Sequence, residues 1–328
     1  MGVCLSPNRR HMHMIHSAKQ IYRIFGLRRS GNHVFIKWLL SQTTASFCFF
    51  NNANLDNLFH RKPDESNASC RDADALIFSF EDRDLDLAMK PEWLTHNGIS
   101  EVRCIDIIMA RDPLDLFASR LKGGMRAPLF FTGLTIPLLY DQYLEKIAAI
   151  GPGNDENNSN NRLAVLFEPF LESAAYREQL RIQLQLGGGV EKMETVDTRY
   201  GGGSSFRRGS KKPPTVDELK NRWKGAKGDP VFRHWVASLN RVDLYGQIFN
   251  PHPERLRFIQ DIKTSKSLPL KAFKFAQSRV INQGVRFLRA SGAVRCLRDC
   301  VDPTRRAYLT GIPSSQNEPI HPTYGETG

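Results

Sequence analysis

The segment Ile21–Leu40, IYRIFGLRRSGNHVFIKWLL, contains two apolar runs separated by a loop that begins and ends with glycine. The first run, 21–25, is typical of a buried strand, and the second, 34–40, is typical of a mostly buried helix. The loop between them, Gly26–Gly31, has the form G-x-x-x-x-G. Glycines let a loop turn its N–H groups around an anion, and the following helix N-terminus adds partial positive charge. The segment therefore predicts a phosphate-binding loop.

The residues after the second glycine distinguish this loop from that of a nucleotide-hydrolysing enzyme. A Walker loop continues with Lys, which reaches the terminal phosphates, and with Ser or Thr, which holds Mg²⁺. This chain has Asn32 and His33 at those positions, and its basic side chains come earlier, at Arg28 and Arg29. Arginine forks can neutralise a phosphate without a metal, so we expect a metal-free site. The residues expected to form it are Arg28, Arg29, Ser30, Gly31, Asn32 and His33.

A second motif, RDPLDLFAS at 111–119, follows an apolar strand at 102–109 and opens a helix. Pro113 suits the first helical turn, and Asp112 is the expected cap. An arginine at a strand end and a serine on the next helix can together clamp one phosphate. We expect Arg111 and Ser119 on the same sheet edge as the first loop, because the carboxyl ends of parallel strands meet there. The alternative is that Arg111 forms a surface ion pair with Asp115.

The two motifs together resemble those of the P-loop sulfotransferases. The string at 29–33 is similar to the family's 5′-phosphosulfate loop, and 111–119 is similar to its 3′-phosphate motif. Asn32 and His33 replace the usual hydroxyl residues, although both can donate hydrogen bonds to phosphate oxygens. The resemblance covers 19–250 and implies a P-loop NTPase-like α/β fold, with three layers (α/β/α) and a central parallel sheet.

The same resemblance implies a reaction. It would be the transfer of a sulfuryl group from 3′-phosphoadenylyl sulfate (PAPS) to a hydroxyl or amine, with no metal. Arg111 and Ser119 would hold the 3′-phosphate of this donor. The acceptor class, whether carbohydrate, lipid or small molecule, is not encoded in any segment of the sequence. Two rival functions stay open: a P-loop kinase or NTPase, and a non-catalytic basic protein with the same fold that binds a membrane surface.

A hydroxyl acceptor needs a general base as it attacks, and a carboxylate pair is available at a strand end. The apolar strand at 75–80 is followed by Glu81 and Asp82. Glu81 is the leading candidate for the base and Asp82 the second, while His33 and His60 remain open. The alternative is that one of the two carboxylates caps the next helix, with Asp82 as the N-cap for Leu85 onward.

Length and charge restrict the class of protein. The chain has 328 residues, enough for one large α/β domain or two small ones. Its net charge of +12 favours an anionic ligand, an acidic partner or a membrane surface. No helix-turn-helix, zinc-finger or ribonucleoprotein motif supports a nucleic-acid partner. The six cysteines do not suggest a disulfide framework, so we expect a reducing, cytoplasmic compartment. No apolar run is long enough to cross a membrane.

The chain divides into three expected parts: a flexible leader at 1–18, the sulfotransferase-like domain at 19–250, and a basic helical extension with a tail at 251–328. Within the extension, 263–306 holds eleven Lys and Arg against two acids. It is either a peripheral contact to an anionic membrane or a solvated helix packed on the domain. The glycine-rich loop at 200–206 precedes Trp223. One interpretation is that Phe206 or Trp223 stacks on the base of a bound nucleotide. The other is that Phe206 belongs to a surface loop and Trp223 to the core.

Overall fold

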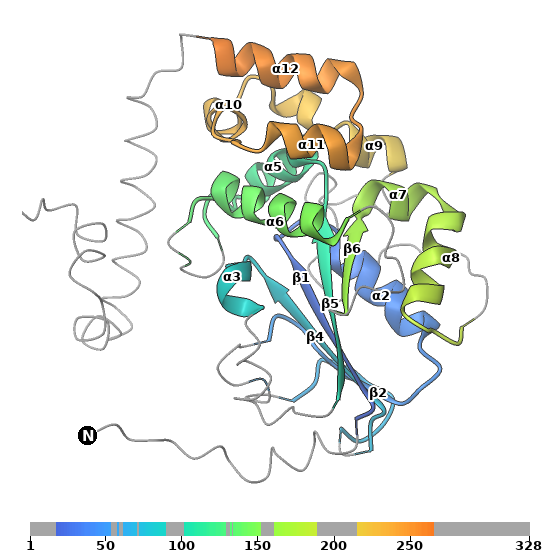
Figure 1. Ribbon diagram of the computed structural model, residues 1–328. Coiled ribbons are helices and arrows are strands. Elements are labelled where there is room, and N and C mark those ends of the chain that lie inside the picture. The colour runs from blue at the N-terminus through green and yellow to red at the C-terminus, as the bar shows by residue number, and fades with distance from the viewer. Residues whose placement is uncertain are drawn as a thin grey trace, which may run out of the picture. The chain divides into compact units, whose positions relative to one another are not determined.

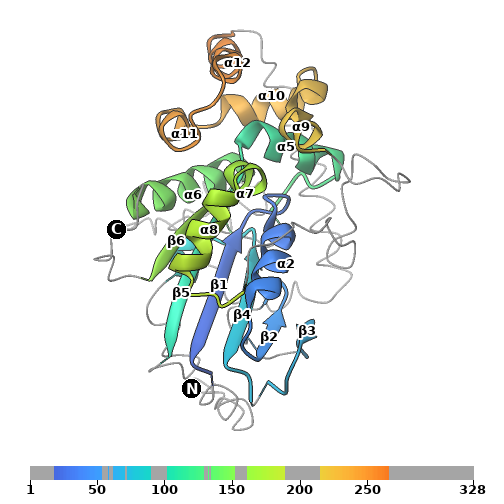
Figure 2. The same cartoon turned by 90° about the vertical axis from the view of Figure 1, so that its right-hand side faces the viewer.

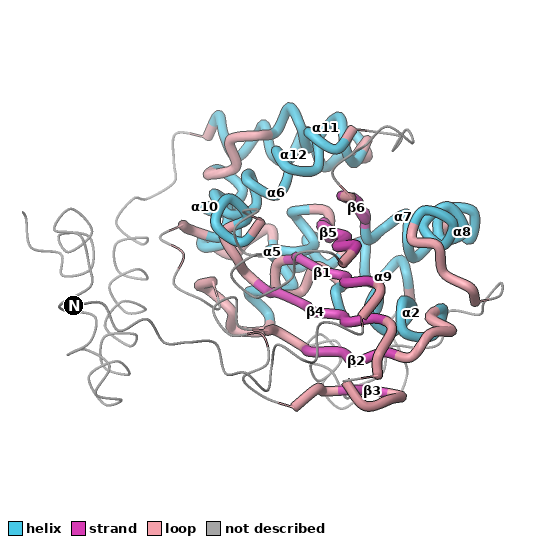
Figure 3. The backbone as a smooth tube through the Cα atoms, turned by 60° about the horizontal axis from the view of Figure 1, so that its bottom comes forward, coloured by secondary structure: helices cyan, strands magenta, loops and turns pink. Residues whose placement is uncertain are grey.

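The computed structural model of the chain describes residues 18–53, 58, 62–70, 72–89, 102–128, 132, 134–151, 161–188 and 215–265. All of them belong to one compact unit that ends at Leu268. Its centre is a six-stranded sheet in the order β3-β2-β4-β1-β5-β6 (Figure 3). The strands are β1 (Gln20–Gly26), β2 (Phe47–Phe50), β3 (Glu65–Ser66), β4 (Ala75–Glu81), β5 (Arg103–Ala110) and β6 (Arg162–Leu166).

The sheet is parallel except at one edge, where the short β3 runs antiparallel to β2. The predicted α/β fold with a central parallel sheet is confirmed. The short strand β3 lies within 51–74, a polar segment whose composition predicts a loop. In the register, Gly26 at the end of β1 lies between Glu81 of β4 and Met109 of β5. The three strands therefore end at the same level. Ligands of open α/β sheets bind outside the carboxyl ends of the strands, so a ligand is expected at this edge.

Helices cover both faces of the sheet and give it three layers (Figures 1 and 2). One face packs on α2 (Asn32–Gln42) and α8 (Ala174–Gln183), through a cluster that includes Tyr22 and Ile24 of β1. The other face packs on α5 (Pro113–Lys122) and α6 (Ile136–Ile150), through a cluster that includes Ile21 and Phe25. Apolar side chains on both faces of a strand are typical of a parallel sheet buried between helices.

The remaining helices lie mostly beyond the carboxyl ends of the strands (Figure 1). They are α3 (Leu85–Ala88), α7 (Phe167–Glu172), α9 (Val216–Lys220), the 3₁₀ helix η2 (Arg222–Ala226), α10 (Pro230–Ala237), α11 (Val242–Phe249) and α12 (Pro253–Thr264). The last of these follows the expected domain boundary at residue 250, and its Ile259 and Ile262 belong to the same core as α10. No described helix is long and apolar enough to cross a bilayer.

The sequence predicts one helix at 172–186 and one at 232–248, and only the second is broken in the structure. The first range contains the single helix α8, which begins after Ser173; the Ser173 side chain caps it by accepting from the Tyr176 backbone N–H. The helix expected at 232–248 ends at Ala237. Asp141 of α6 accepts the backbone N–H groups of Asn240 and Arg241, which fixes the connecting segment in a non-helical conformation.

Cys48 of β2 and Cys70 form a disulfide, so the prediction that the cysteines stay reduced is wrong for this pair. The pairing is possible because the chain folds back through β3 along the edge of the sheet. Disulfides persist mainly in oxidising compartments, so the pair argues against the predicted cytoplasmic location. The one free cysteine within the described ranges, Cys104, has a partly buried side chain, and burial raises the pKa of its thiol to about 12.

The disulfide is expected to stabilise the fold by restricting the unfolded chain. The cysteines are 22 residues apart, and closing a loop of that length contributes about 3 kcal/mol in the chain-entropy description. The double variant Cys48→Ala/Cys70→Ala should have a free energy of unfolding in urea that is lower by about this amount. Adding a reductant should no longer change that free energy. Cys104→Ala is the control and should keep the reductant dependence of the wild type. Equal stability of the wild type with and without reductant would contradict the assignment.

Candidate phosphate-binding site

The loop between β1 and α2 depends on both of its glycines. Gly31 is the N-cap of α2 with φ of 100°, and a Cβ atom there would lie 2.1 Å from the Phe167 ring. A Cβ atom at Gly26 would lie 1.9 Å from Oδ1 of Asn32. Arg29 also has a left-handed backbone, with φ of 76°. The loop thus turns tightly into α2, whose first N–H groups have no acceptor within the helix.

The two predicted motifs meet around the hydroxyl of Ser119. Arg29 Nε donates to Ser119 Oγ at 3.3 Å, and Arg222 Nη1 donates to the same oxygen at 3.0 Å. Arg111 Nη1 donates to the backbone carbonyl of Arg29 at 3.2 Å. The structure therefore brings together Arg29, Arg111 and Ser119, as the sequence predicted. We call Arg29, Arg111, Arg222 and Ser119 the arginine cluster.

The electrostatics of the arginine cluster favour an anion. Burial lowers the pKa of Arg29, and the charge of Arg111 lowers it further. Burial lowers the pKa of Arg222 to about 9, and the charges of Arg111 and Arg29 add to this shift. Like charges held together in a buried place disfavour the charged forms. An anion placed among them would offset both the repulsion and the lost hydration.

Arg111 is almost completely buried, and its guanidinium already has partners inside the protein. Nη2 donates to the carbonyl of Leu219 at 2.5 Å, Nε lies 3.8 Å from Glu168 Oε1, and the group lies 4.9 Å from the centre of the Phe167 ring. The alternative ion pair with Asp115 is not formed, since Asp115 pairs with Arg255 of α12 at 2.8 Å. Asp112 caps α5 by accepting from the Leu114 N–H, as predicted.

Arg222 is the member of the cluster that the sequence analysis did not assign. Its position depends on η2, which packs on α5 and whose Trp223 backbone N–H donates to Asp115 Oδ1 at 3.2 Å. Ser119 and Arg222 are 103 residues apart in the chain. No local pattern links them; only the basic composition around Arg222 hinted at an anion site.

Of the two alternatives for Trp223, the structure supports a core residue. Its ring is 1% exposed, Lys227 Nζ lies 4.3 Å from the ring centre, and the Phe258 ring lies 5.1 Å away. These contacts leave no open face for a nucleotide base. The loop 200–206, with Phe206, lies outside the described residues.

Glu81 lies beside the loop and close to two of its residues. Its Oε1 is 3.5 Å from His33 Nε2, and its Oε2 is 3.7 Å from Arg28 Nε. Burial raises the pKa of Glu81, and the charge of Asp82 raises it further. Burial, followed by the charges of Arg29 and Arg28, lowers the pKa of His33 to about 4, so its imidazole is neutral at pH 7. The neutral imidazole of His33 can accept a proton, as a general base must.

Asp82 is fully buried, and this corrects its assignment as the second candidate base. Its two carboxylate oxygens accept from Arg120 at 2.7 and 2.9 Å, and Oδ1 also accepts from the Arg28 backbone N–H at 2.9 Å. The predicted N-cap role is also wrong, because Asp84 caps α3 by accepting from the Asp86 and Leu87 N–H groups. His60, the other open candidate, lies outside the described residues.

Ser30 and Asn32 are both buried, and Ser30 Oγ donates to Asn32 Oδ1 at 2.7 Å. The Ser30 hydroxyl therefore already has a hydrogen-bond partner within the turn into α2. Among the described residues, no group of three or more His, Cys, Asp or Glu side chains is arranged to hold a metal ion.

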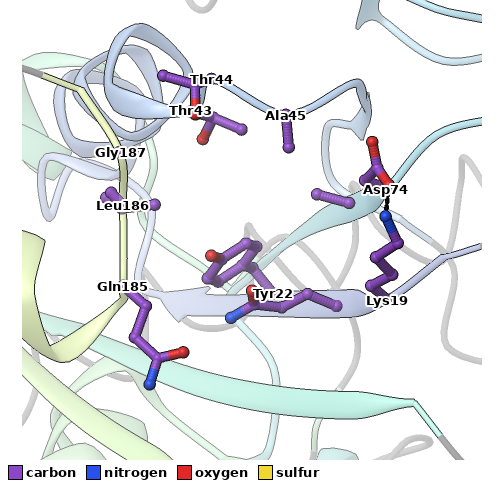
Figure 4. Close-up of a pocket in the computed structure, with 11 residues that line it drawn as sticks. Lys19, Tyr22, Thr43, Thr44, Ala45, Asp74, Gln185, Leu186 and Gly187 are labelled. Carbon is purple, nitrogen blue, oxygen red and sulfur yellow. Dashed lines mark ion pairs between the residues drawn. The ribbon is translucent and has the colours of Figure 1, made fainter.

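A separate pocket of about 260 Å³ lies at the opposite, amino-terminal ends of β1 and β4 (Figure 4). Tyr22 lies at its base, and its hydroxyl donates to the Leu184 carbonyl. The Lys19–Asp74 ion pair, at 2.7 Å, lies at one side. None of the predicted site residues lines this pocket.

No family model matches the chain, and no curated protein matches it. Among solved structures, the chain is similar to mouse sulfotransferase SULT7A1 complexed with PAP. The two share 11% sequence identity over 78% of this chain and 94% of that chain, with a TM-score of 0.37. A likeness at this level does not establish a function, so the assignment rests on the residues of this chain.

Proposed function

We propose that the chain is a sulfotransferase that moves a sulfuryl group from PAPS to a hydroxyl or amine acceptor. The observation that carries the proposal is the convergence of Arg29 and Arg222 on Ser119, with Arg111 against the same loop. PAPS carries phosphate at both its 5′ and 3′ positions. Two adjoining anion sites, one on the β1–α2 loop and one after β5, suit a ligand with that charge pattern.

In this proposal each motif has its own role. The residues of the loop, 28–33, hold the 5′-phosphosulfate through backbone N–H groups and through the Arg28 and Arg29 guanidinium groups. Arg111 and Ser119 hold the 3′-phosphate, and Arg222 joins them because its guanidinium already lies 3.0 Å from the Ser119 hydroxyl. Arginine forks suit phosphate oxygens, which accept two parallel hydrogen bonds.

The chemistry needs one proton transfer and one group transfer. Glu81 takes the proton from the acceptor O–H as the acceptor oxygen bonds to sulfur. The bond from sulfur to the 5′-phosphate oxygen breaks, and adenosine 3′,5′-bisphosphate leaves. Negative charge grows on that leaving oxygen, where the loop and its arginines stabilise it. No metal is needed, because the arginines supply the positive charge.

The two rival functions make different demands on the same site. A kinase or NTPase needs a cation and a metal-binding hydroxyl after the second glycine, where this chain has Asn32 and His33. A non-catalytic membrane-surface protein needs only the anion sites and the basic region at 263–306. Nearly all of that region lies outside the described residues, so its contact with a membrane stays a prediction.

A transfer assay tests the proposal directly. The protein is incubated with PAPS labelled with ³⁵S and with fractionated carbohydrate, lipid and small-molecule acceptors, in the presence of EDTA. We expect label in one acceptor class and an equal amount of released adenosine 3′,5′-bisphosphate. Binding of the bisphosphate without transfer to any fraction would support the non-catalytic alternative. In a parallel incubation with Mg-ATP and without EDTA, phosphate transfer from ATP would support a kinase.

A further inference from the structure

We propose that the buried Asp82–Arg120 ion pair is a positioning device that holds the backbone of the phosphate loop in its anion-binding conformation. The inference rests on the proposed function, since it assigns a part of the 5′-phosphosulfate site. Asp82 follows β4, and Arg120 lies on α5 next to Ser119. Both side chains are fully excluded from solvent.

The pair contacts the backbone of Arg28 on both sides. Asp82 Oδ1 accepts from the Arg28 N–H at 2.9 Å, and Arg120 Nη1 donates to the Arg28 carbonyl at 3.1 Å. The backbone N–H of Asp82 also donates to the Gly26 carbonyl at 3.1 Å. One ion pair therefore fixes the main chain of the loop where it leaves β1, and it does so from two neighbouring elements.

The loop needs such support because its backbone is strained. Arg29 has φ of 76°, and Asp82 itself has φ of 53°, both in the left-handed region that disfavours side chains with a Cβ. Such conformations persist when surrounding contacts determine them. The direction of the two loop arginines follows from this backbone: Arg28 points to Glu81 and Arg29 to Ser119.

A purely structural role predicts a different outcome from a positioning role. Replacing a buried ion pair with apolar side chains of similar volume is often neutral for stability. If the pair only fills space, such a replacement leaves ligand binding unchanged. If it positions the loop, the protein stays folded while its affinity for the 5′-phosphate falls. Affinity for the 3′-phosphate is retained, because Arg111 and Arg222 lie on other segments.

The test uses calorimetry to measure the affinity of three proteins for two ligands. The ligands are adenosine 3′,5′-bisphosphate and adenosine 3′-monophosphate, which lacks the 5′ group. The proteins are the wild type, Asp82→Leu/Arg120→Met and Arg120→Lys. Lysine keeps the charge but cannot bridge Asp82 and the Arg28 carbonyl as a fork does. Thermal unfolding of each variant reports whether it is folded.

A matched control is a buried ion pair within the sheet, Arg23–Asp106, which joins β1 to β5 at 2.6 and 2.8 Å. Its apolar replacement, Arg23→Met/Asp106→Leu, is expected to bind both ligands as the wild type does. For Asp82→Leu/Arg120→Met we expect at least a tenfold weaker bisphosphate affinity, with the monophosphate affinity within twofold. Arg120→Lys is expected to change in the same direction by a smaller factor.

Two outcomes would overturn the inference. One is a folded Asp82→Leu/Arg120→Met that binds both ligands as the wild type does, which would make the pair purely structural. The other is an equal loss for both ligands, which would show that the pair does not act on the loop in particular. If the double variant does not unfold cooperatively, Arg120→Lys decides the question. The quantity compared is then its loss of affinity for the bisphosphate relative to its loss of affinity for the monophosphate. A wild type that binds neither ligand would overturn the proposed function instead.

Discussion

Arg111→Met is expected to weaken the binding of adenosine 3′,5′-bisphosphate by about 100-fold. Hydrogen bonds between charged groups contribute about 1.5–3 kcal/mol each, and the upper end of that range is about a 100-fold change in affinity. Arg111 also holds the loop through the Arg29 carbonyl, so its loss affects both phosphate sites. Calorimetry on the wild type and the variant measures the change.

Arg103→Met is the matched control for this prediction. Arg103 begins the same strand, β5, that Arg111 follows, and its guanidinium donates to Gln185 at the opposite end of the sheet. Its replacement should leave the bisphosphate affinity unchanged. An unfolding curve for each variant separates lost binding from lost structure. If Arg111→Met stays folded and binds the bisphosphate as tightly as the wild type, the 3′-phosphate assignment is wrong.

Glu81→Gln is expected to lower kcat for sulfuryl transfer by about 10³-fold, within the range that a general base contributes. The amide keeps the shape of the carboxylate but cannot accept the proton. The bisphosphate affinity should change by about threefold at most, because Glu81 has no assigned contact with either phosphate. Steady-state kinetics and calorimetry on the same preparation give the two values.

The pH dependence of kcat gives a second check on Glu81. A general base works in its deprotonated form, so the rate rises as pH increases through its pKa. Burial raises the pKa of Glu81 above its ordinary value of 4.5, so the acidic limb of the wild type should lie above pH 4.5. His33→Asn should keep that limb, since the pKa of His33 is lowered to about 4. Loss of activity in His33→Asn, with activity retained in Glu81→Gln, would assign the base to His33.

The sequence predicted the parts of the site that depend on local pattern. The apolar runs on either side of Gly26–Gly31 fix a strand, a turn and a helix in immediate succession. The Asp112–Pro113 start of α5 depends on capping, which is also local. The parallel register then placed Arg111 and Ser119 beside the loop, because strands of one sheet end at the same edge.

Contacts between distant segments were not predictable from pattern. Arg222 reaches Ser119 because η2 packs on α5, and the register of that packing depends on Asp115 and Arg255. Glu81 and Asp82 look equivalent in the sequence. The left-handed backbone of Asp82 turns its side chain into the core toward Arg120, while Glu81 stays beside the loop. The Cys48–Cys70 disulfide depends on β3, which is too short to recognise.

The most direct test of the central claim is calorimetric titration of the wild type with adenosine 3′,5′-bisphosphate in EDTA, beside a titration with Mg-ATP. The claim is that the arginine cluster and the β1–α2 loop form one metal-free site for a nucleotide with phosphates at both its 5′ and 3′ positions. We expect binding of the bisphosphate in EDTA at one site per chain, and much weaker binding of Mg-ATP. Absence of bisphosphate binding, or a preference for Mg-ATP, would contradict the assignment of both motifs.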